Sequence, residues 1–286
     1  MPEFERYVAP QTLAEALDVL SAGDATILAG GTDLMPQTRS GKLPPRPVLM
    51  NIQHVAELRG IATVDGSVRI GALTRVTELM ASPVVRERLP ILWQSCDHFA
   101  SDQIRNIATL GGNICNASPA GDTLVPLLVL SAMVELSQHS GGKLRTRSLP
   151  VADFVTGPGR TRREPGELLT AVEMPLPRAD WVCGFLKFGT RPALDIATVA
   201  IGLGGVLVGR ALHDVRVVFG AVAPTPIRSR AAERTLEGRP LDDAAIEAAV
   251  RAADEDIRPI SDVRASDWYR HELVRNLLRR MLRNVR

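Results

Sequence analysis

The sequence predicts an α+β protein with two domains, and three observations support this. Short helical and strand patterns alternate over residues 1–176, where two loops carry paired glycines. Residues 175–180 are polar and contain two prolines, which is typical of a domain boundary. Long strand patterns followed by amphipathic helices fill residues 177–286, as expected for an antiparallel sheet that carries helices.

The composition fits an ordinary globular protein. The chain has 286 residues, of which 45% are hydrophobic and 23% charged, so it can bury a sizeable core. A net charge of +2 gives no reason to expect nucleic acid or a membrane surface as a partner. The apolar runs, such as residues 124–130, are too short to span a bilayer.

Cysteine usage and the N-terminus favour a cytoplasmic protein. Cys96, Cys115 and Cys183 are scattered and odd in number, which is typical of a reducing compartment. They are too few for the usual four ligands of an iron–sulfur cluster, and the histidines lie apart, so we expect no metal site in this chain. Residues 1–10 lack the basic and apolar pattern of a secretion signal.

The first domain is predicted to open with a helix. Thr12 and Glu15 match a capping box, and Leu13, Leu17 and Leu20 share one face of a helix over residues 12–23. The sequence Asp65-Gly66 between β-branched residues predicts a hairpin. The other elements that we expect in this domain are strands at 26–29 and 48–52, helices at 74–80, 84–93 and 124–130, strands at 133–136 and 143–147, an exposed loop at 157–163, and a strand at 168–174.

The second domain is predicted to be a sheet followed by helices. We expect strands at 182–188, 197–208 and 211–222, then helices at 227–236, 242–253 and 266–286. The last helix has an apolar stripe, and its arginines predict a solvated face or a subunit contact. These arginines are Arg270, Arg275, Arg279, Arg280, Arg283 and Arg286.

Two loops with paired glycines, at residues 27–34 and 109–123, are the strongest functional signal. Paired glycines allow positive φ and let a ligand approach the backbone, and successive N–H groups can bind an anion. Asp122 could accept hydrogen bonds from ribose hydroxyls. Together the loops predict a cradle for a large, phosphate-bearing cofactor. Neither matches a P-loop or a dinucleotide fingerprint, and we interpret the glycines at 202–205 as a closely packed strand.

The two loops also resemble a known family. Residues 29–33 read Ala-Gly-Gly-Thr-Asp, and residues 108–122 read Ala-Thr-Leu-Gly-Gly-Asn-Ile-x-Asn-Ala-Ser-Pro-x-x-Asp. This pair resembles the FAD-binding medium subunit of the molybdenum hydroxylases, the group of xanthine dehydrogenase and carbon monoxide dehydrogenase. Further similarity lies at residues 105–108, 166–170, 173–175, 185–188 and 193–197, so it covers nearly the whole chain.

The resemblance implies a fold for each domain. Residues 1–176 would form a two-lobed FAD-binding domain of the PCMH type, as in relatives of vanillyl-alcohol oxidase. Residues 177–286 would form a smaller C-terminal domain like that of the CO dehydrogenase flavoprotein, with an antiparallel sheet and helices.

The resemblance also implies which residues bind FAD. The pyrophosphate would be wrapped by backbone N–H groups of Leu28, Ala29, Gly30, Gly31, Thr32, Asp33 and Leu34, and the cradle completed by Thr109, Gly111, Gly112 and Asn113. Ser118 and Asp122 would hold the ribityl or ribose end. Phe99 would lie near the cofactor, Leu169 and Lys187 would contact the flavin or its chain, and Asp195 and Ile196 would lie at the flavin face. The alternatives are core packing for Leu169, a solvated surface position for Lys187, and an Ile196 that replaces the tyrosine of some relatives without its ring stacking.

The function that the resemblance implies is electron transfer. The FAD would be non-covalent, because Gly31-Thr32-Asp33 stands where covalent relatives have histidine, and no cysteine-rich insertion for a further cluster is present. A large partner would hold the molybdenum cofactor and a small partner two [2Fe–2S] clusters, in a heterotrimer or a dimer of heterotrimers. The acceptor would be NAD, a quinone, oxygen or another oxidant, and the substrate a purine, an aldehyde, an N-heterocycle or carbon monoxide.

Two other functions are compatible with the sequence. One is a stand-alone FAD-dependent reductase of the enolpyruvyl-sugar reductase type. The other is a structural subunit that has lost FAD. No residue pattern in the chain predicts a catalytic nucleophile or an acid–base pair.

Overall fold

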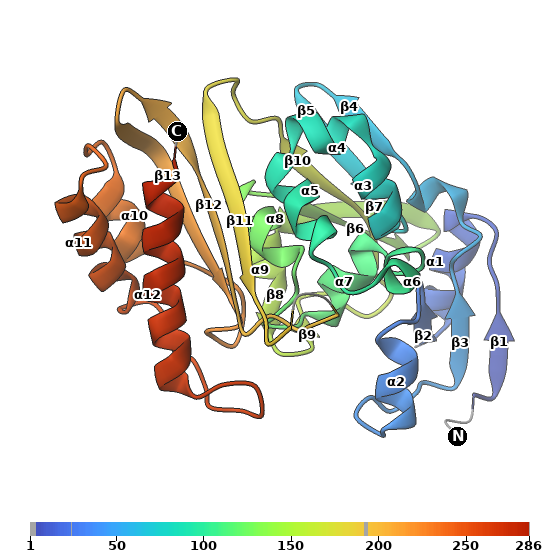
Figure 1. Cartoon of the computed structure of the whole chain (residues 1–286). Helices are drawn as coiled ribbons and strands as arrows, with labels where there is room; N and C mark the ends of the chain where they lie inside the picture. The colour runs from blue at the N-terminus through green and yellow to red at the C-terminus, as the bar shows by residue number, and fades with distance from the viewer. Residues whose placement is uncertain (1–3, 24, 192–193, 286) are drawn as a thin grey trace.

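The structure is a computed structural model that describes residues 4–23, 25–191 and 194–285. Figure 1 shows an N-terminal lobe, a central lobe and a C-terminal lobe, each built on its own sheet. No helix in these described ranges is both long and apolar enough to cross a membrane.

The N-terminal lobe is a small parallel sheet in the strand order β1-β3-β2. Thr12 caps α1 by accepting a hydrogen bond from the Glu15 N–H at 3.2 Å, as the capping pattern predicted. The core of the lobe contains Leu17, Met50 and Leu58. Its elements are β1 (Arg6–Val8), α1 (Leu13–Ala22), β2 (Ala25–Leu28), α2 (Leu34–Arg39), β3 (Val48–Asn51) and the 3₁₀ helix η1 (Ala56–Leu58).

The central lobe is a five-stranded antiparallel sheet in the order β4-β5-β10-β6-β7. The Asp65-Gly66 turn joins β4 to β5 with φ values of 47° and 77°, which confirms the predicted hairpin. The strands are β4 (Ile61–Val64), β5 (Ser67–Gly71), β6 (Met133–Ser140), β7 (Lys143–Pro150) and β10 (Leu168–Pro175).

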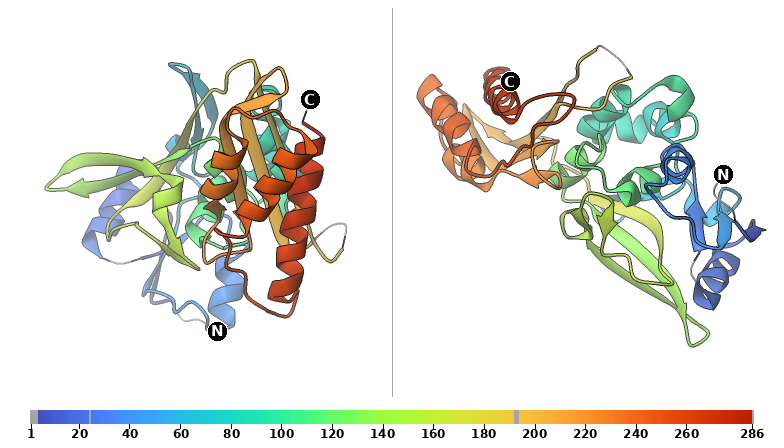
Figure 2. Two further views of the ribbon diagram at one scale, coloured as in Figure 1. Left: turned by 90° about the vertical axis from the view of Figure 1, so that its left-hand side faces the viewer. Right: turned by 90° about the horizontal axis from the view of Figure 1, so that it is seen from below.

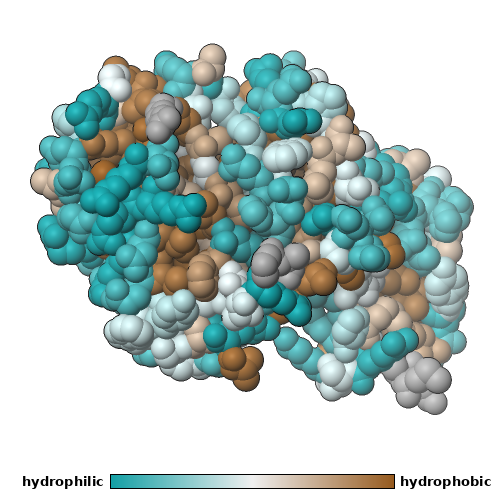
Figure 3. Space-filling model, in the orientation of Figure 1, coloured by the Kyte–Doolittle hydropathy of each residue, from teal (hydrophilic) through white to brown (hydrophobic). Residues whose placement is uncertain are grey.

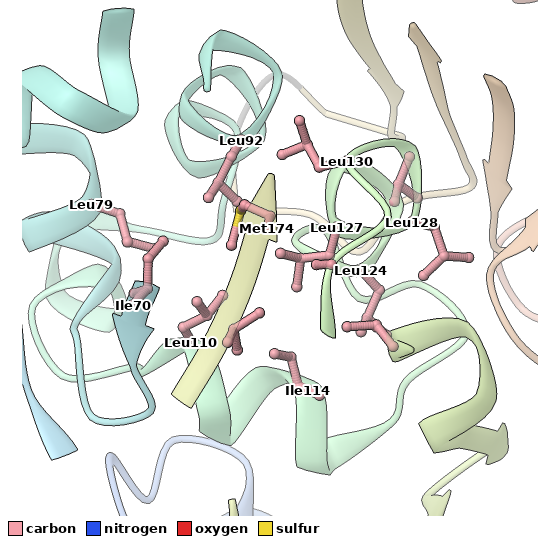
Figure 4. Close-up of a cluster of buried hydrophobic side chains, with 14 of the residues drawn as sticks. Ile70, Leu79, Leu92, Leu110, Ile114, Leu124, Leu127, Leu128, Leu130 and Met174 are labelled. Atoms are coloured by element: carbon pink, nitrogen blue, oxygen red, sulfur yellow. The ribbon is translucent and has the colours of Figure 1, made fainter. Parts of the chain in front are cut away.

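Short helices cover this sheet and fill its core. Figure 4 shows Leu110 and Ile114 in the same buried cluster as Leu124, Leu127 and Met174. Every residue of α8 (Leu124–Val129) is buried, as expected for a helix packed behind the second glycine loop. The other helices of this lobe are α3 (Val76–Ala81), α4 (Pro83–Arg88), α5 (Pro90–Asp97), α6 (Asp102–Arg105), α7 (Leu110–Asn116) and α9 (Val151–Phe154).

Four sequence predictions about local structure were wrong. The helix expected at 84–93 is two helices, α4 and α5, because Pro90 has no N–H to continue the first. The loop expected at 157–163 includes part of a small hairpin of β8 (Val155–Gly157) and β9 (Arg160–Thr161). The helix expected at 227–236 begins only at Arg230, after the short strand β14 (Ile227–Arg228). The expected loop at 109–123 contains α7.

The C-terminal lobe is an antiparallel sheet that is covered on both faces. Helices α10 (Arg230–Leu236), α11 (Asp243–Ala253) and α12 (Asp267–Arg283) cover one face, and α5 and α8 of the central lobe contact the other (Figures 1 and 2). The strand order is β11-β12-β13-β14, with β11 (Trp181–Phe188), β12 (Val199–Val208) and β13 (Ala211–Gly220).

Glycines in this sheet allow the two domains to pack closely. A Cβ on Gly202 would lie 2.8 Å from Val129 Cγ2, and one on Gly220 would lie 2.9 Å from Val125 Cγ2. Both valines belong to α8, so the helix lies directly on the sheet at these positions. This confirms our interpretation of the glycines at 202–205 as close packing in a strand.

Candidate FAD-binding site

The fold brings the two glycine loops into contact. A Cβ on Gly30 would lie 2.3 Å from the Ile107 carbonyl oxygen, so only glycine fits against the segment that leads into the second loop. Behind this contact, Gln37 of α2 donates a hydrogen bond from Nε2 to Asn116 Oδ1 of α7 at 2.8 Å. Gln37 was not singled out from the sequence, and Ile107 was noted only within the motif at residues 105–108, because their partners lie 79 and 77 positions away.

The first loop connects β2 to α2 and presents free backbone donors. Gly31 has φ +72°, and the Met35 N–H donates to the Gly31 carbonyl at 3.1 Å to start the helix. The backbone N–H groups of residues 30–34 donate to no other residue within the described ranges. Asp33 stands at the N-cap position, but its side chain does not cap the helix. Successive free N–H groups form a concavity that suits an anion.

The second loop contains the first turn of α7, and its backbone N–H groups already donate hydrogen bonds within the protein. Thr109 caps α7, and its Oγ1 accepts from the Gly112 N–H at 3.1 Å. The Gly111 N–H donates to the Ala72 carbonyl at 2.9 Å, and the Asn113 N–H donates to the Thr109 carbonyl at 3.0 Å. A Cβ on Gly111 would lie 2.7 Å from Ala72 Cβ. This segment is therefore closely packed, and it lies beside the first loop, whose backbone N–H groups are free.

A buried ion pair involves Asp122, near the end of the second loop. Lys187 Nζ lies 2.7 Å from Asp122 Oδ2, and the two side chains are only 7% and 9% exposed. Lys187 also donates to the His98 carbonyl at 3.0 Å, so the alternative of a solvated surface lysine was wrong. Burial raises the pKa of Asp122 to about 6, while the charge and hydrogen bond of Lys187 oppose this rise. Asp122 Oδ1 is buried without a hydrogen-bond partner among the described residues.

Three other predicted site residues lie in or beside the core. Phe99 is buried, and its carbonyl accepts from Arg105 Nη1 at 2.7 Å. The Leu169 side chain is buried in the central core on β10, and a contact of Leu169 with the flavin stays a prediction. Ser118 is half-buried, and its Oγ accepts from the Ala120 N–H at 3.2 Å.

The predicted flavin-face pair lies in the connection between β11 and β12. The Asp195 carboxylate accepts from the Thr190 hydroxyl at 2.9 Å and from the Arg191 N–H at 3.3 Å, so it holds this connection in shape. The pKa of Asp195 is lowered overall. Partial burial acts to raise this pKa, but the hydrogen bonds that the carboxylate accepts, first of all those from Thr190, outweigh it. Ile196 is exposed. Ala193, part of the same motif, lies outside the described residues.

The site offers groups that can bind a ligand. Within the described ranges, no group of three or more His, Cys, Asp or Glu side chains could hold a metal ion. The arrangement offers backbone donors for a phosphate and a buried carboxylate oxygen for a hydroxyl.

Comparison with known proteins establishes the family. Residues 2–177 match the model of the FAD binding domain in molybdopterin dehydrogenase, and residues 185–285 match that of the CO dehydrogenase flavoprotein C-terminal domain. The chain belongs to the family of FAD-binding medium subunits of xanthine dehydrogenase and CO dehydrogenase. It is therefore a flavoprotein component of an oxidoreductase, as the resemblance implied.

The similarity extends over the full length of its relatives. The chain is 35% identical to the xanthine dehydrogenase FAD-binding subunit of Escherichia coli O157:H7, over 99% of this chain and 96% of the relative. It is 34% identical to the glyceraldehyde dehydrogenase medium chain of Sulfolobus acidocaldarius, over 99% of each. Carbon monoxide dehydrogenase from Hydrogenophaga pseudoflava superposes with a TM-score of 0.92 at 30% identity, covering 98% of this chain and 96% of that one. These matches confirm the predicted fold class.

Proposed function

We propose that this chain is the electron-transfer subunit of a molybdenum hydroxylase complex, taking electrons from the [2Fe–2S] clusters of a partner and passing them to an external acceptor. The acceptor is NAD, a quinone or another oxidant. The observation that carries the proposal is the contact between the two glycine loops, since it places the free N–H groups of residues 30–34 beside α7.

The residues present fit FAD. The N–H groups of residues 30–34 suit the pyrophosphate, which carries the negative charge of the cofactor. Asp122 Oδ1 lacks a partner although it is buried, and a ribityl or ribose hydroxyl would satisfy it. Bound FAD supplies the redox chemistry, while the protein positions it and tunes its potential. The remaining predicted contacts, from Phe99, Ser118, Leu169, Asp195 and Ile196, stay part of this proposal.

Lys187 has two roles in the proposed site. It compensates the charge of Asp122 where the two domains meet, because the two residues belong to β11 and to the segment before α8. It also donates a hydrogen bond to the His98 carbonyl at 3.0 Å, which ties β11 to the end of α5.

The names of the relatives support the proposed partners. Several are named medium chains or FAD-binding subunits, which identifies them as one chain of a larger enzyme. We propose a large subunit with the molybdenum cofactor and a small subunit with [2Fe–2S] clusters, assembled in the cytoplasm. The relatives bear the names of xanthine, glyceraldehyde and carbon monoxide dehydrogenases, so this subunit type does not itself select the substrate.

Purification of the chain with whatever co-purifies tests the proposal. We expect about one acid-released FAD per chain, one larger and one smaller partner, and iron in the smaller partner. A yellow monomer without partners that oxidises NADPH would replace the proposal with a stand-alone reductase. A colourless monomer that takes up no FAD would leave only a structural subunit.

A further inference from the structure

Arg270 of α12 points into the protein. The sequence predicted a solvated face or a subunit contact for the arginines of this helix, and the solvated position is wrong for Arg270, which is only 3% exposed. Figure 3 shows hydrophilic side chains over much of the outer surface at α11 and α12, as expected for the solvated side of these helices. Arg270 lies beneath that surface, so its charge must be compensated inside the protein.

The Arg270 guanidinium connects three segments of the chain. Its Nη1 donates to the carbonyl oxygens of Thr198 and Ala221 at 3.1 and 2.7 Å, and its Nη2 donates to Asp262 Oδ1 at 2.7 Å. Thr198 directly precedes β12, Ala221 directly follows β13, and Asp262 belongs to the loop before α12. The planar fork of an arginine holds several acceptors in one fixed geometry, which a lysine cannot do.

This arrangement is costly for a residue that only fills the core. Arg270 Nε and Thr198 Oγ1 are both buried without a hydrogen-bond partner among the described residues. Each unmet polar group costs stability, and an apolar side chain in place of a buried ion is often at least as stable. The cost favours a role of Arg270 in fixing geometry.

Ala221 connects Arg270 to the second glycine loop. Its carbonyl accepts from Arg270, and its N–H donates to the Pro119 carbonyl at 2.8 Å. Its φ is +63°, a left-handed conformation that a residue other than glycine keeps only when its surroundings hold it there. The guanidinium is one such contact, so it helps to set the direction of the N–H that holds Pro119.

The position of Pro119 affects where Asp122 lies. The residues between them form a compact turn, in which the Ala120 N–H donates to Ser118 Oγ at 3.2 Å and the Gly121 N–H donates to the Ser118 carbonyl at 2.9 Å. Asp122 follows this turn directly. A shift of Pro119 would therefore move the carboxylate that we propose for the ribityl or ribose end of FAD.

Thr198 connects Arg270 to the other half of the buried ion pair. The Thr198 N–H donates to the Phe188 carbonyl at 2.8 Å, and Phe188 is the last residue of β11, next to Lys187. Arg270 binds the carbonyl of the same Thr198. The guanidinium therefore contacts two residues that lead, by one further hydrogen bond each, toward Lys187 and Asp122.

We infer that Arg270 is a positioning residue for the FAD site. The inference rests on the proposed function. Arg270 acts through two backbone carbonyls on the second glycine loop and on the end of β11, and so keeps Asp122 and Lys187 in place. The competing explanation is that Arg270 only stabilises the C-terminal lobe.

The test compares Arg270→Lys with Arg275→Lys in the full chain. Both substitutions keep the charge on α12, and each guanidinium donates three hydrogen bonds to described residues. Arg275 donates to Asp254 at the end of α11 and to Glu272 of α12 itself. The readouts are the hydrogen-exchange rate of the Ala221 amide in the flavin-free chain and the dissociation constant of FAD. Amides of β6 in the central sheet are the reference for global unfolding.

Arg270→Lys should raise the exchange rate of the Ala221 amide at least ~10-fold over that in Arg275→Lys, while the amides of β6 change equally in both variants. It should also weaken FAD binding at least ~10-fold. Asp262→Asn, which removes only the charge of the third acceptor, is the milder variant if Arg270→Lys does not fold. It should change both readouts in the same direction.

An Ala221 exchange rate or an FAD affinity equal to that of Arg275→Lys would overturn the inference. So would a parallel rise of exchange at Ala221 and in β6, because it would show that Arg270 only stabilises the fold. The proposed function fails separately: it is refuted by a wild-type chain that binds no FAD, whereas a wild type and an Arg270→Lys variant that bind FAD equally well refute this inference alone.

Discussion

Lys187 on β11 and Asp122 before α8 form a buried ion pair across the junction of the two domains, with 2.7 Å between Nζ and Oδ2. Asp122 belongs to the second glycine loop, and one of its oxygens has no hydrogen-bond partner among the described residues. It couples the packing of the domains to the proposed cofactor site.

Replacing Lys187 should destabilise the protein strongly. Lys187→Met leaves the Asp122 carboxylate buried without its cation, and breaking a buried pair in this way costs about 3–5 kcal/mol. Urea unfolding of the flavin-free chain measures the loss. Lys143→Met on the exposed strand β7 is the matched control and should change stability by less than about 0.5 kcal/mol. Equal stability of the two variants would contradict the role of the pair.

The raised pKa of Asp122 should be visible as a pH dependence of stability. Its folded pKa of about 6 lies above the ordinary value of 3.8 for an aspartate, so the folded protein holds this proton more tightly than the unfolded chain. The contribution of Asp122 is thus largest below pH ~4 and is lost as the pH rises through about 6.

Asp122→Asn isolates this contribution. The free energy of unfolding of the wild type minus that of the variant should fall between pH 4 and pH 7. Parallel pH profiles would show that Asp122 titrates normally.

A side chain at position 30 should separate the two glycine loops. Gly30→Ala places a Cβ 2.3 Å from the Ile107 carbonyl oxygen, so the first loop must move away from α7. We expect FAD to bind at least ~10-fold more weakly, which corresponds to about 1.4 kcal/mol. Gly23→Ala is the control, because nothing lies within 4 Å of its added Cβ. Equal FAD affinity in the two variants, measured by flavin fluorescence, would show that the contact between the loops is not needed.

Local sequence signals predicted much of the fold. The Thr12 cap, the Asp65-Gly66 turn and the apolar run at 124–130 each depend on neighbouring residues, and each was confirmed. The glycines of the two loops pointed to a binding site because their conformational freedom can be read from the sequence alone.

The geometry of the site depends on contacts between distant residues and could not be predicted in the same way. Lys187 was predicted to contact the flavin or its chain, with a solvated surface position as the alternative, and its ion pair with Asp122 was not foreseen because the two residues lie 65 positions apart. The hydrogen bond from the Gly111 N–H to the Ala72 carbonyl could not be predicted either, because it forms only when the intervening helices have folded. The break between α4 and α5 at Pro90 was a local signal that the apolar pattern of residues 84–93 obscured.

The most direct test of the account is to mix the FAD-loaded chain anaerobically with its small [2Fe–2S] partner, after that partner has been reduced with dithionite and freed of excess reductant. We expect the flavin absorption to fall while the iron–sulfur absorption returns. Gly30→Ala should reduce the amplitude in proportion to its lost FAD. A flavin that stays oxidised beside the reduced partner would contradict the role of this chain as the electron-transfer subunit.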